Sequence, residues 1–425
     1  MRIMVIGGGG REYGIAKKLS EDPRVDKLFV LPGGGGMEEF AECVPIKATD
    51  LEGVCGFASE NEIDFAVVTP DDPLAMGMAD RLRAMGVPCF GPNKAAARIE
   101  SSKIFAKELM KKYGVPTASA VSLYSAGEAR EYVNNAELPL VIKADGLALG
   151  KGVFICRTRE EAEDAITELM DNRLFGASGE RVLVEEFLEG PEVTVLSFTD
   201  GKTVVPMVAS MDHKTIGEGG TGPNTGGMGV IAPNPFYTKE IAAECMERIF
   251  LPTVNAMAEE GCPFTGCLYF GLMLTKNGPK VIEYNSRFGD PEAQTVLPLM
   301  ETPLLDAMLA CESGDLAETP VRFSDKAACC VVLVSGGYPG KYQKGLPITF
   351  GELDEKTLVV HAGTKRTEDG YVTNGGRVLN VIRVEDTLEE AVRSAYEEAE
   401  KISFPGVYMR RDVGKTAIDA LAERD

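Results

Sequence analysis

The sequence predicts an α/β protein of several domains, the first of which is a doubly wound parallel-sheet domain. Strand-like apolar runs at residues 2–6, 27–31 and 65–68 alternate with a helix-like segment at 11–19. Such alternation is typical of a parallel sheet with helices on both faces, which binds its ligands at the carboxyl ends of its strands. The length of 425 residues is enough for roughly two to four domains.

Four glycines at residues 7–10 join the first predicted strand to the first helix. The free backbone N–H groups at a helix N-terminus attract anions. Arg11 adds a cation directly after the glycines, so we expect Gly9, Gly10 and Arg11 to form an anion site. A nicotinamide dinucleotide is excluded, because Gly-x-Gly-x-x-Gly requires a third glycine where the chain has Glu12.

A short predicted strand presents three functional side chains on one face. Every second residue of a strand points the same way, so Glu283, Asn285 and Arg287 align. Ile282 and Tyr284 are then expected to face a core. Carboxylate and amide oxygens suit Mg²⁺ in a site whose other ligands are water and substrate phosphates. The guanidinium adds a fork for a phosphate or carboxylate.

This strand is expected to pair with an apolar run at residues 268–275, because Asn277-Gly278 is a strong hairpin signal. Helices are expected at residues 160–170, 239–260 and 304–311. A further helix should run over residues 103–112, with Ser102 as its N-cap. These elements give the middle of the chain both strands and helices.

Two glycine-rich segments have the composition of phosphate-binding or closing loops. In residues 139–154, Lys143 ends an apolar strand and precedes a glycine turn and a second strand from Val153. Glycines let backbone N–H groups approach phosphate oxygens, and the lysine adds a point charge. The second segment, residues 212–229, is polar and has no apolar periodicity, as functional or disordered loops do. For each segment alone, a flexible surface turn remains an alternative.

An apolar strand at residues 182–188 runs into Glu185 and Glu186. On spacing alone, both acids are expected to be exposed strand-end charges. The last domain should begin near residue 321 with a buried strand at 327–334. A capping box, formed by Thr387 and the acid three residues later, predicts a further helix. The apolar stripe of this helix predicts that it packs on the core.

The composition is that of an ordinary globular protein, with 44% hydrophobic and 26% charged residues. A formal net charge of −21 argues against nucleic-acid and anionic-membrane binding. Ten cysteines without a Cys-x-x-Cys pair predict reduced thiols and a cytoplasmic location rather than a zinc site or disulfides. The N-terminal apolar run is too short for a signal peptide, and no run of about 20 apolar residues could span a bilayer.

Seven motifs, in this order and spacing, resemble those of the phosphoribosylamine–glycine ligase family of ATP-grasp enzymes. They lie at residues 8–12, 90–92, 142–146, 185–188, 222–229, 287–292 and 373–377. The resemblance runs the length of the chain. It implies an N-terminal substrate-binding α/β domain, an ATP-grasp domain with a small and a large lobe, and a C-terminal α+β domain. Their expected bounds are 1–102, 103–190, 191–320 and 321–425.

The resemblance implies a ligase that joins glycine to 5-phosphoribosylamine, using ATP and Mg²⁺ or Mn²⁺. The implied ATP-contacting residues are Lys103, Lys143, Glu185, Glu186, Leu188 and Glu192. The implied metal ligands are Glu283 and Asn285, and the implied catalytic residues are Arg287, Asp212 and Lys214. The implied substrate-binding residues are Gly9, Gly10, Arg11, Asn224, Thr225, Gly226, Gly227 and Asp290.

Two alternatives remain open at the level of the sequence. Tyr13, Gly34 and Asp71 depart from the family pattern in the domain that is expected to bind the amine, so a related ligase with a different amine substrate is the first. The second is a non-catalytic ATP-binding regulatory or scaffold protein. Intact Lys143 and Glu283 argue against it, because such a protein has no need to hold magnesium on a transferring phosphate.

Overall fold

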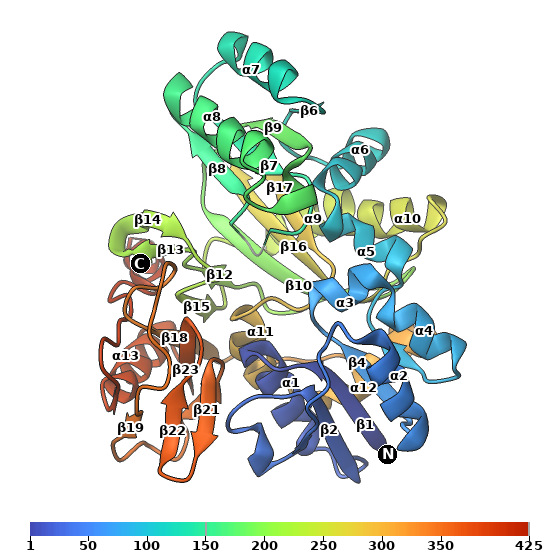
Figure 1. Ribbon diagram of the computed structural model, residues 1–425, viewed down its shortest axis with the longest axis vertical. Helices are drawn as coiled ribbons and strands as arrows, with labels where there is room; N and C mark the ends of the chain where they lie inside the picture. Colours follow the sequence, from blue (N-terminus) through green and yellow to red (C-terminus); the bar gives the residue numbers. More distant parts are fainter. Residues whose placement is uncertain (149–150, 424–425) are drawn as a thin grey trace.

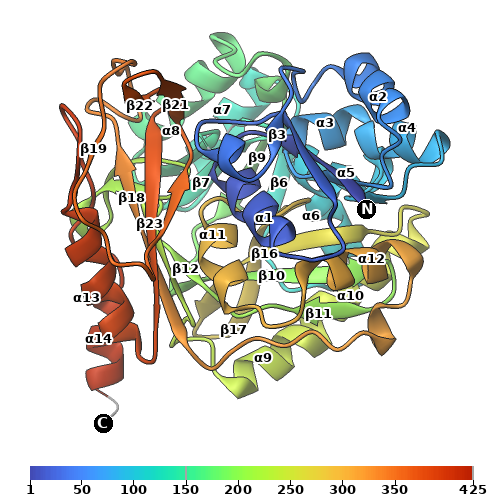
Figure 2. The ribbon, with the colours of Figure 1, turned by 90° about the horizontal axis from the view of Figure 1, so that it is seen from below.

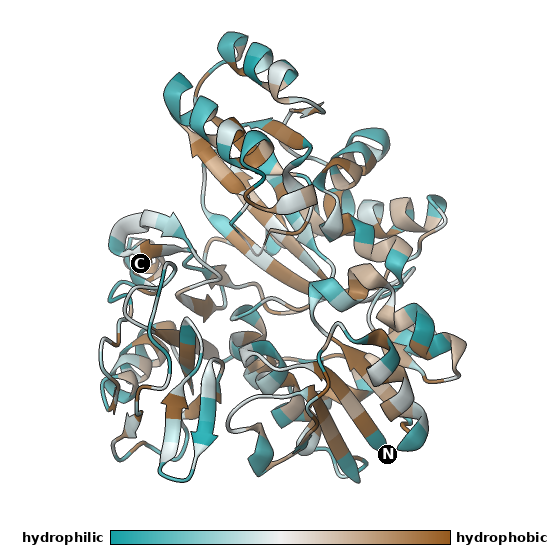
Figure 3. Ribbon diagram, viewed as in Figure 1, coloured by the Kyte–Doolittle hydropathy of each residue, from teal (hydrophilic) through white to brown (hydrophobic). Residues whose placement is uncertain are grey.

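The computed structural model describes residues 1–148 and 151–423. Figure 1 shows the N-terminal sheet and the C-terminal domain side by side, with the two lobes of the middle region above them. Figure 3 shows apolar residues concentrated in the central strands and hydrophilic ones on the outer helices. Within the described ranges, no helix combines the length and apolar character that a membrane crossing needs.

The N-terminal sheet is parallel, in the order β3-β2-β1-β4-β5. Its strands are β1 (Arg2–Gly7), β2 (Lys27–Pro32), β3 (Glu42–Cys43), β4 (Phe65–Val68) and β5 (Cys89–Phe90). Its helices are α1 (Gly10–Ser20), α2 (Leu51–Glu60), α3 (Asp71–Met76) and α4 (Met78–Ala84). Ile3 and Val5 enter one core, whereas Met4 and Ile6 enter another, as alternate residues of a strand between two helical layers must. The predicted doubly wound domain is confirmed.

The small lobe is an antiparallel sheet in the order β6-β9-β7-β8, with two helices packed on it. Its elements are β6 (Ala120–Leu123), α7 (Ala126–Asn135), β7 (Leu140–Ala144), β8 (Val153–Cys156), α8 (Arg159–Ile166) and β9 (Val182–Glu186). A π-helical turn, Thr167–Asp171, extends α8. The β7–β8 turn carries the predicted glycines, of which Gly150 lies outside the described residues.

The large lobe has an antiparallel sheet in the order β11-β10-β16-β17. Its strands are β10 (Glu192–Asp200), β11 (Val204–Pro206), β16 (Thr265–Thr275) and β17 (Gly278–Asn285). The associated helices are α5 (Lys94–Ser101), α6 (Lys103–Tyr113), α9 (Lys239–Cys245), α10 (Leu251–Glu259), α11 (Glu292–Val296) and α12 (Leu304–Ser313). Met246–Phe250 joins α9 to α10 as a π-helical turn, so the expected helix at 239–260 is one continuous helical stretch.

The β16–β17 hairpin forms as predicted but contains a β-bulge. Gly271 pairs with Glu283. The next residue, Leu272, pairs with Val281, which leaves Ile282 as the extra residue. A bulge shifts the in–out alternation of a strand, and Ile282 is only half-buried. The expectation that Ile282 faces a core is therefore wrong.

The C-terminal sheet has the order β12-β15-β18-β23-β20, and Figure 2 shows α13 and α14 along its outer side. Its elements are β12 (Met211–Asp212), β15 (Gly229–Ala232), β18 (Ala327–Val334), β20 (Leu358–His361), β23 (Arg377–Glu385), α13 (Leu388–Ala399) and α14 (Lys415–Ala422). Smaller two-stranded sheets pair β13 (Thr215–Gly217) with β14 (Thr221–Asn224), β19 (Thr349–Phe350) with β24 (Ile402–Ser403), and β21 (Thr364–Thr367) with β22 (Gly370–Thr373). Because β12 and β15 belong to this sheet, both ends of the segment between them are anchored to the C-terminal part of the chain.

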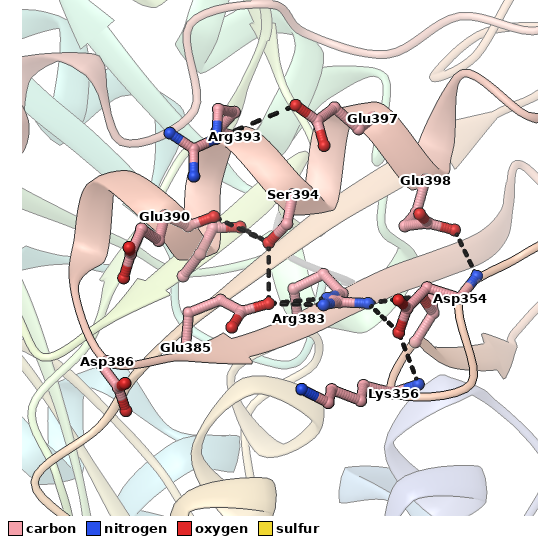
Figure 4. A network of polar contacts seen from close by, with 12 residues as sticks. Asp354, Lys356, Arg383, Glu385, Asp386, Glu390, Arg393, Ser394, Glu397 and Glu398 are labelled. Carbon is pink, nitrogen blue, oxygen red and sulfur yellow. Dashed lines mark hydrogen bonds and ion pairs between the residues drawn. The ribbon is translucent and has the colours of Figure 1, made fainter.

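A polar network fixes α13 to β23 at the far end of this sheet (Figure 4). The Arg383 guanidinium pairs with Asp354 at 2.7 Å and with Glu385 at 2.6 Å. The Ser394 hydroxyl of α13 donates to the Glu385 carboxylate at 3.3 Å. Thr387 caps α13 as predicted. The network stabilises the C-terminal domain away from the residues that the sequence selects for function.

Candidate active site

Glu185 lies buried between two lysines near the end of β9. Its carboxylate oxygens are 2.8 Å from Nζ of Lys143 and 2.8 Å from Nζ of Lys107. Lys143 also donates to the Ile282 carbonyl at 2.9 Å. Burial would raise the pKa of Glu185, but the two lysines outweigh it and lower the pKa. The expectation of an exposed Glu185 is wrong, because the side chain at this register of β9 points to the lysines.

Asp145 fixes the N-terminus of α6 and thereby Lys103. One carboxylate oxygen accepts hydrogen bonds from the Ser102 hydroxyl and the Ile104 backbone N–H, both at 2.9 Å. Ser102 is the N-cap of α6, as predicted. The Lys103 ammonium donates to the Gly146 carbonyl at 3.2 Å, and burial lowers its pKa. The start of α6 therefore holds this lysine at the turn that follows β7.

Glu283 and Asn285 lie two residues apart beyond the bulge of β17, and Arg287 follows the end of that strand. The Arg287 guanidinium donates to the Asn285 side-chain oxygen at 3.4 Å and pairs with Glu100 at 2.8 Å. Glu100 also accepts from the backbone N–H and the hydroxyl of Ser286, both at 2.8 Å. Glu100 thus places Arg287 beside Asn285 although the arginine is not in the strand.

Lys214 joins the segment between β12 and β15 to the predicted metal ligands. Its Nζ lies 3.5 Å from Glu283 and 3.1 Å from Glu192. Burial alone would lower the pKa of Lys214, but carboxylates, Glu192 first among them, raise it well above its ordinary value. Burial would raise the pKa of Glu283, but Lys214 and Lys143 outweigh it and lower the pKa. The result is an ionised carboxylate among cations.

The glycine turn after β1 already holds a carboxylate of the protein. Glu12 accepts from the Gly9 backbone N–H at 2.7 Å and from the Thr69 hydroxyl at 2.7 Å. It also pairs with Arg11 at 2.6 Å. A Cβ built on Gly9 would lie 3.6 Å from Oδ2 of Asp290. The Gly9 N–H is therefore already bonded by the Glu12 carboxylate, and the substrate-anion site expected at this turn stays a prediction.

Gly10 faces the protein interior. A Cβ at this position would lie 2.6 Å from Nε2 of Gln294 and 2.9 Å from Nδ2 of Asn380. Gln294 in turn donates to Oδ1 of Asp290 at 2.7 Å. Gly10 therefore permits α1 to approach α11 and β23 closely, and the substrate contact expected of it stays a prediction.

The segment between β12 and β15 is built around a hairpin of β13 and β14 rather than a structureless loop. The Thr225 backbone N–H and hydroxyl donate to the Lys214 carbonyl at 2.7 and 2.8 Å. The Thr225 hydroxyl accepts from the Gly227 N–H at 3.0 Å. Arg377 donates to the Gly226 carbonyl at 2.6 Å. These contacts fix the backbone that leads from Lys214 to the glycines.

Asp212 and Glu292 are acids with raised pKa values beside this segment. Burial, together with the Glu292 carboxylate, raises the pKa of Asp212 well above its ordinary value. Burial also raises the pKa of Glu292. Oδ1 of Asp212 has no hydrogen-bond partner among the residues that the structure describes. The two carboxylates therefore disfavour each other's ionised form in this corner of the site.

Three predicted residues lie at the margins of the site. Glu186 is exposed, and its carboxylate accepts from Lys280 at 3.0 Å and from the Ser119 N–H at 2.9 Å. Leu188 follows β9 and is half-buried, and Asn224 ends β14 and is half-buried. The ATP and substrate contacts expected of these residues therefore stay predictions.

Three charged residues of the site were not selected from the sequence. Lys107 lies one helical turn after Lys103 on α6, a spacing that could have suggested a shared face. Glu100 precedes the Ser102 cap by two residues but approaches Arg287 only through the fold. Arg377 stands in the motif at 373–377, where the sequence alone gives no partner for it.

Family models match almost the whole chain. The N domain of phosphoribosylglycinamide synthetase matches residues 1–100, its ATP-grasp (A) domain matches 101–293 and its C domain matches 328–416. A phosphoribosylamine–glycine ligase of Caldanaerobacter subterraneus subsp. tengcongensis is 46% identical over 97% of this chain and 99% of that protein. One of Halalkalibacterium halodurans is 45% identical over 98% of this chain and 97% of that protein.

Solved structures agree with these matches. The crystal structure of phosphoribosylamine–glycine ligase from Thermotoga maritima has a TM-score of 0.84 and 34% identity, covering 97% of this chain and 100% of that one. A biotin carboxylase domain from Hydrogenobacter thermophilus has a TM-score of 0.74 at 18% identity, covering 96% of this chain and 91% of that one, and shows a shared fold only. The predicted family and ATP-grasp fold are confirmed: the chain belongs to the phosphoribosylglycinamide synthetase family.

Proposed function

We propose that the chain is an ATP-dependent ligase that joins the carboxylate of glycine to the amine of 5-phosphoribosylamine in purine biosynthesis. The observation that carries this proposal is the set of cations around Glu283, namely Lys214, Lys143, Lys103 and Arg287. Transfer of a phosphoryl group to a carboxylate needs charge neutralisation and positioning rather than a protein nucleophile. The curated relatives carry the name of this activity.

ATP binds between the two lobes in this proposal. Lys143 lies near the end of β7, and Lys103 begins α6 on the other side of the glycine turn. Phosphates bound at this turn would contact both ammonium groups. The adenine would lie against the β9 end, formed by Glu185, Glu186 and Leu188. Glu192 is exposed at the start of β10 and would accept hydrogen bonds from the ribose hydroxyls.

Glu283 and Asn285 would hold Mg²⁺ or Mn²⁺. The donor set fits, because an ionised carboxylate and an amide oxygen are hard ligands that leave room for phosphate oxygens and water. Among the described residues there is no cluster of three or more His, Cys, Asp or Glu side chains suited to a metal. Phosphate oxygens and water would supply the other ligands. When bound, the metal would offset the charge of the phosphates that are being separated.

The reaction then takes two steps. A carboxylate oxygen of glycine attacks the γ-phosphorus of ATP, which gives glycyl phosphate and releases ADP. The amine nitrogen of phosphoribosylamine attacks the carbonyl carbon; the C–N bond forms, the C–O bond to phosphate breaks, and the nitrogen loses one proton. Arg287 offsets charge on the transferring group, and Asp212 and Lys214 orient glycine. Catalysis comes from positioning and charge neutralisation.

Phosphoribosylamine would enter from the N-terminal domain. Gly9, Gly10 and Arg11 begin α1 next to Asp290, and Asn224, Thr225, Gly226 and Gly227 approach the same region from the other side. We retain the division at 1–102, 103–190, 191–320 and 321–425, with small molecules as the partners and the cytoplasm as the location. The net charge of −21 supports the exclusion of nucleic acid.

The test is an ATP-to-ADP assay with glycine and with phosphoribosylamine generated in place. ADP formation that requires both substrates is the expected result, with equal amounts of ADP and ligated product. A parallel panel of other amines tests the related ligase. Turnover with another amine and none with phosphoribosylamine would overturn the substrate assignment. ATP binding without any glycine-dependent ADP would overturn the assignment as an enzyme.

A further inference from the structure

Arg377, at the start of β23, contacts two segments of the site with one guanidinium group. Nη1 donates to the backbone carbonyls of Gly226 at 2.6 Å, Asp290 at 2.7 Å and Gly227 at 3.4 Å. Nη2 pairs with the Asp290 carboxylate at 3.2 Å. The planar fork of an arginine can serve several acceptors at fixed angles, which a lysine cannot. Arg377 therefore ties the glycine turn to the loop that carries Asp290.

The glycine turn fits tightly between the arginine and the opposite wall. A Cβ on Gly226 would lie 2.8 Å from Cζ of Arg377. Gly227 has a φ of +114°, and a Cβ there would lie 2.7 Å from Oδ1 of Asp212 and 2.5 Å from Cδ of Pro291. The two glycines thus allow the arginine to approach the turn from one side and Asp212 from the other.

The C-terminal domain also binds the N–H side of this turn. The Gly226 N–H donates to the Tyr338 hydroxyl at 3.2 Å. Both backbone polar groups of Gly226 are therefore bonded by side chains from the last domain, Tyr338 on one side and Arg377 on the other. Backbone groups held in this way are positioned before any ligand arrives.

We propose that Arg377 is a positioning residue for ligation, which holds the Gly226–Gly227 turn against Asp290 and thereby keeps Lys214 opposite Glu283. The inference rests on the proposed function. The arginine acts through the turn rather than on the substrates. Thr225 connects the turn to Lys214 across the base of the β13–β14 hairpin, because its hydroxyl donates to the Lys214 carbonyl and accepts from the Gly227 N–H.

The charge of Arg377 has a second effect on the same loop. Burial would raise the pKa of Asp290, but the charges of Arg377 and Arg11 outweigh burial and lower it. Asp290 therefore stays ionised between two arginines. Without Arg377, a half-buried carboxylate would lose one of its two cations while the turn loses its anchor.

Loss of this anchor should uncouple the two chemical steps. Glycyl phosphate reacts with water to give glycine and phosphate when water reaches it, which consumes ATP without product. Exclusion of water by ordered segments prevents such side reactions. A loosened turn should therefore raise the ratio of ADP to ligated product above the value of one expected for the wild type.

The experiment compares Arg377→Met, Arg377→Lys and the control Arg383→Met. Arg383 lies six residues further along β23, where it pairs with Asp354 and Glu385 in the network of Figure 4. For Arg377→Met we expect a fall in product formation of about 10²-fold, the cost of a small misplacement at a catalytic site, and an excess of ADP over product. Arg377→Lys should lie between Met and wild type, and Arg383→Met should keep a ratio of one.

Three further measurements separate this inference from its alternatives. Gly226→Ala pushes the guanidinium away without removing its charge, and it should reproduce the uncoupling even if Arg377→Met folds poorly. Added guanidinium ion at millimolar concentration should partly restore coupling in Arg377→Ala. The urea midpoint of each variant shows whether stability alone has changed.

The outcomes are distinct. A ratio of one with near-normal turnover in Arg377→Met would overturn the inference, as would equal losses of activity and stability in Arg377→Met and Arg383→Met. A wild-type protein that forms no ADP with glycine and phosphoribosylamine would instead overturn the proposed function.

Discussion

The two sides of the candidate site handle charge differently. On one side is the lysine cluster, formed by Lys103, Lys143 and Lys214. Lys103 and Lys143 each donate to a backbone carbonyl. Lys143 also shares the Glu185 carboxylate with Lys107, and Lys214 lies between two carboxylates. On the other side is the domain junction, where α1, α11 and the start of β23 meet. There Arg11 pairs with Glu12 and Arg377 pairs with Asp290.

The difference indicates which side rearranges on binding. A phosphate can replace a carbonyl or a shared carboxylate as the partner of a lysine, so the lysine cluster is suited to accept a polyanion. The domain junction is already satisfied by contacts within the protein, and it positions the loops instead. We therefore expect substitutions in the lysine cluster to affect catalysis most, and substitutions in the junction to affect stability and coupling.

The largest effect is expected for Glu283→Gln in the centre of the lysine cluster. The change removes the one charge that a metal ligand needs but keeps the shape of the side chain. Ligation should fall by about 10³-fold or more, as for loss of a main electrostatic element of a transition state, while urea unfolding should show that the variant still folds. Near-normal turnover at saturating magnesium would contradict the assignment of Glu283 as a ligand.

A smaller loss of activity is expected for Lys143→Met, with Lys202→Met as its matched control. Lys143 is buried against Glu185, whereas Lys202 is exposed in the turn after β10. Loss of a phosphate-contacting cation should lower kcat/KM for ATP by about 10²- to 10³-fold. The Lys202 variant should remain within about twofold of wild type, since exposed substitutions rarely matter. Equal, small effects at both positions would show that Lys143 does not contact ATP.

The strands were predictable because their patterns are local. Apolar runs at residues 2–6, 27–31 and 65–68 predicted strands whose bounds differ from those of β1, β2 and β4 by at most one residue. The Asn277-Gly278 turn and the Ser102 cap are likewise set by neighbours in sequence.

The errors at the site have a different origin. The bulge at Ile282 and the burial of Glu185 depend on partners in other strands. Glu12 bonds the Gly9 N–H within a local capping box, but its bond to the Thr69 hydroxyl depends on the tertiary fold. Contacts between residues so distant in the chain leave no periodic pattern, and a single sequence cannot reveal them.

Two of the residues at which the first domain departs from the family pattern, Tyr13 and Gly34, make packing contacts in the structure. Tyr13 is 7% exposed and packs edge-on against Phe40, with ring centroids 5.1 Å apart, and against His361 at 5.9 Å. A Cβ on Gly34 would lie 2.7 Å from the Gly8 carbonyl oxygen. Both residues therefore serve packing between or within domains.

A loss of stability is expected for Gly10→Ala at the domain junction, with Gly56→Ala as its control. The new methyl at residue 10 would collide with Gln294 and Asn380, and overpacking costs about 1–3 kcal/mol. Gly56 lies inside α2, and a Cβ there meets nothing within 4 Å. Alanine should stabilise that helix by roughly 0.5–1 kcal/mol. Urea unfolding should show a lower stability for Gly10→Ala and a higher stability for Gly56→Ala than for the wild type. An unchanged stability of Gly10→Ala would mean that the junction packs less closely.

The smallest effect concerns pH and the two histidines of the chain, both of which lie in or next to the domain junction. Burial lowers the pKa of His213 and of His361 to about 4. Nε2 of His213 accepts from the Gly414 N–H at 3.1 Å, which requires a neutral ring. His361 packs between Tyr13 and Tyr371, with ring centroids 4.4 Å from the latter.

The sign of the pH effect follows from linkage. The folded pKa lies below the unfolded value of about 6.5, so the unfolded chain binds more protons in between. The contribution of each neutral histidine to the free energy of unfolding is fully present above pH 6.5 and is lost as the pH drops towards 4. Between pH 7 and pH 5.5 each histidine should cost about 1 kcal/mol. Urea unfolding of the wild type, His213→Gln and His361→Phe should be measured at pH 7 and at pH 5.5. The comparison separates the pH dependence due to the histidines from that due to the carboxylates. If His361→Phe kept the full pH dependence, His361 would bind a proton as readily in the folded protein as in the unfolded chain, and the junction would be open to water rather than closed.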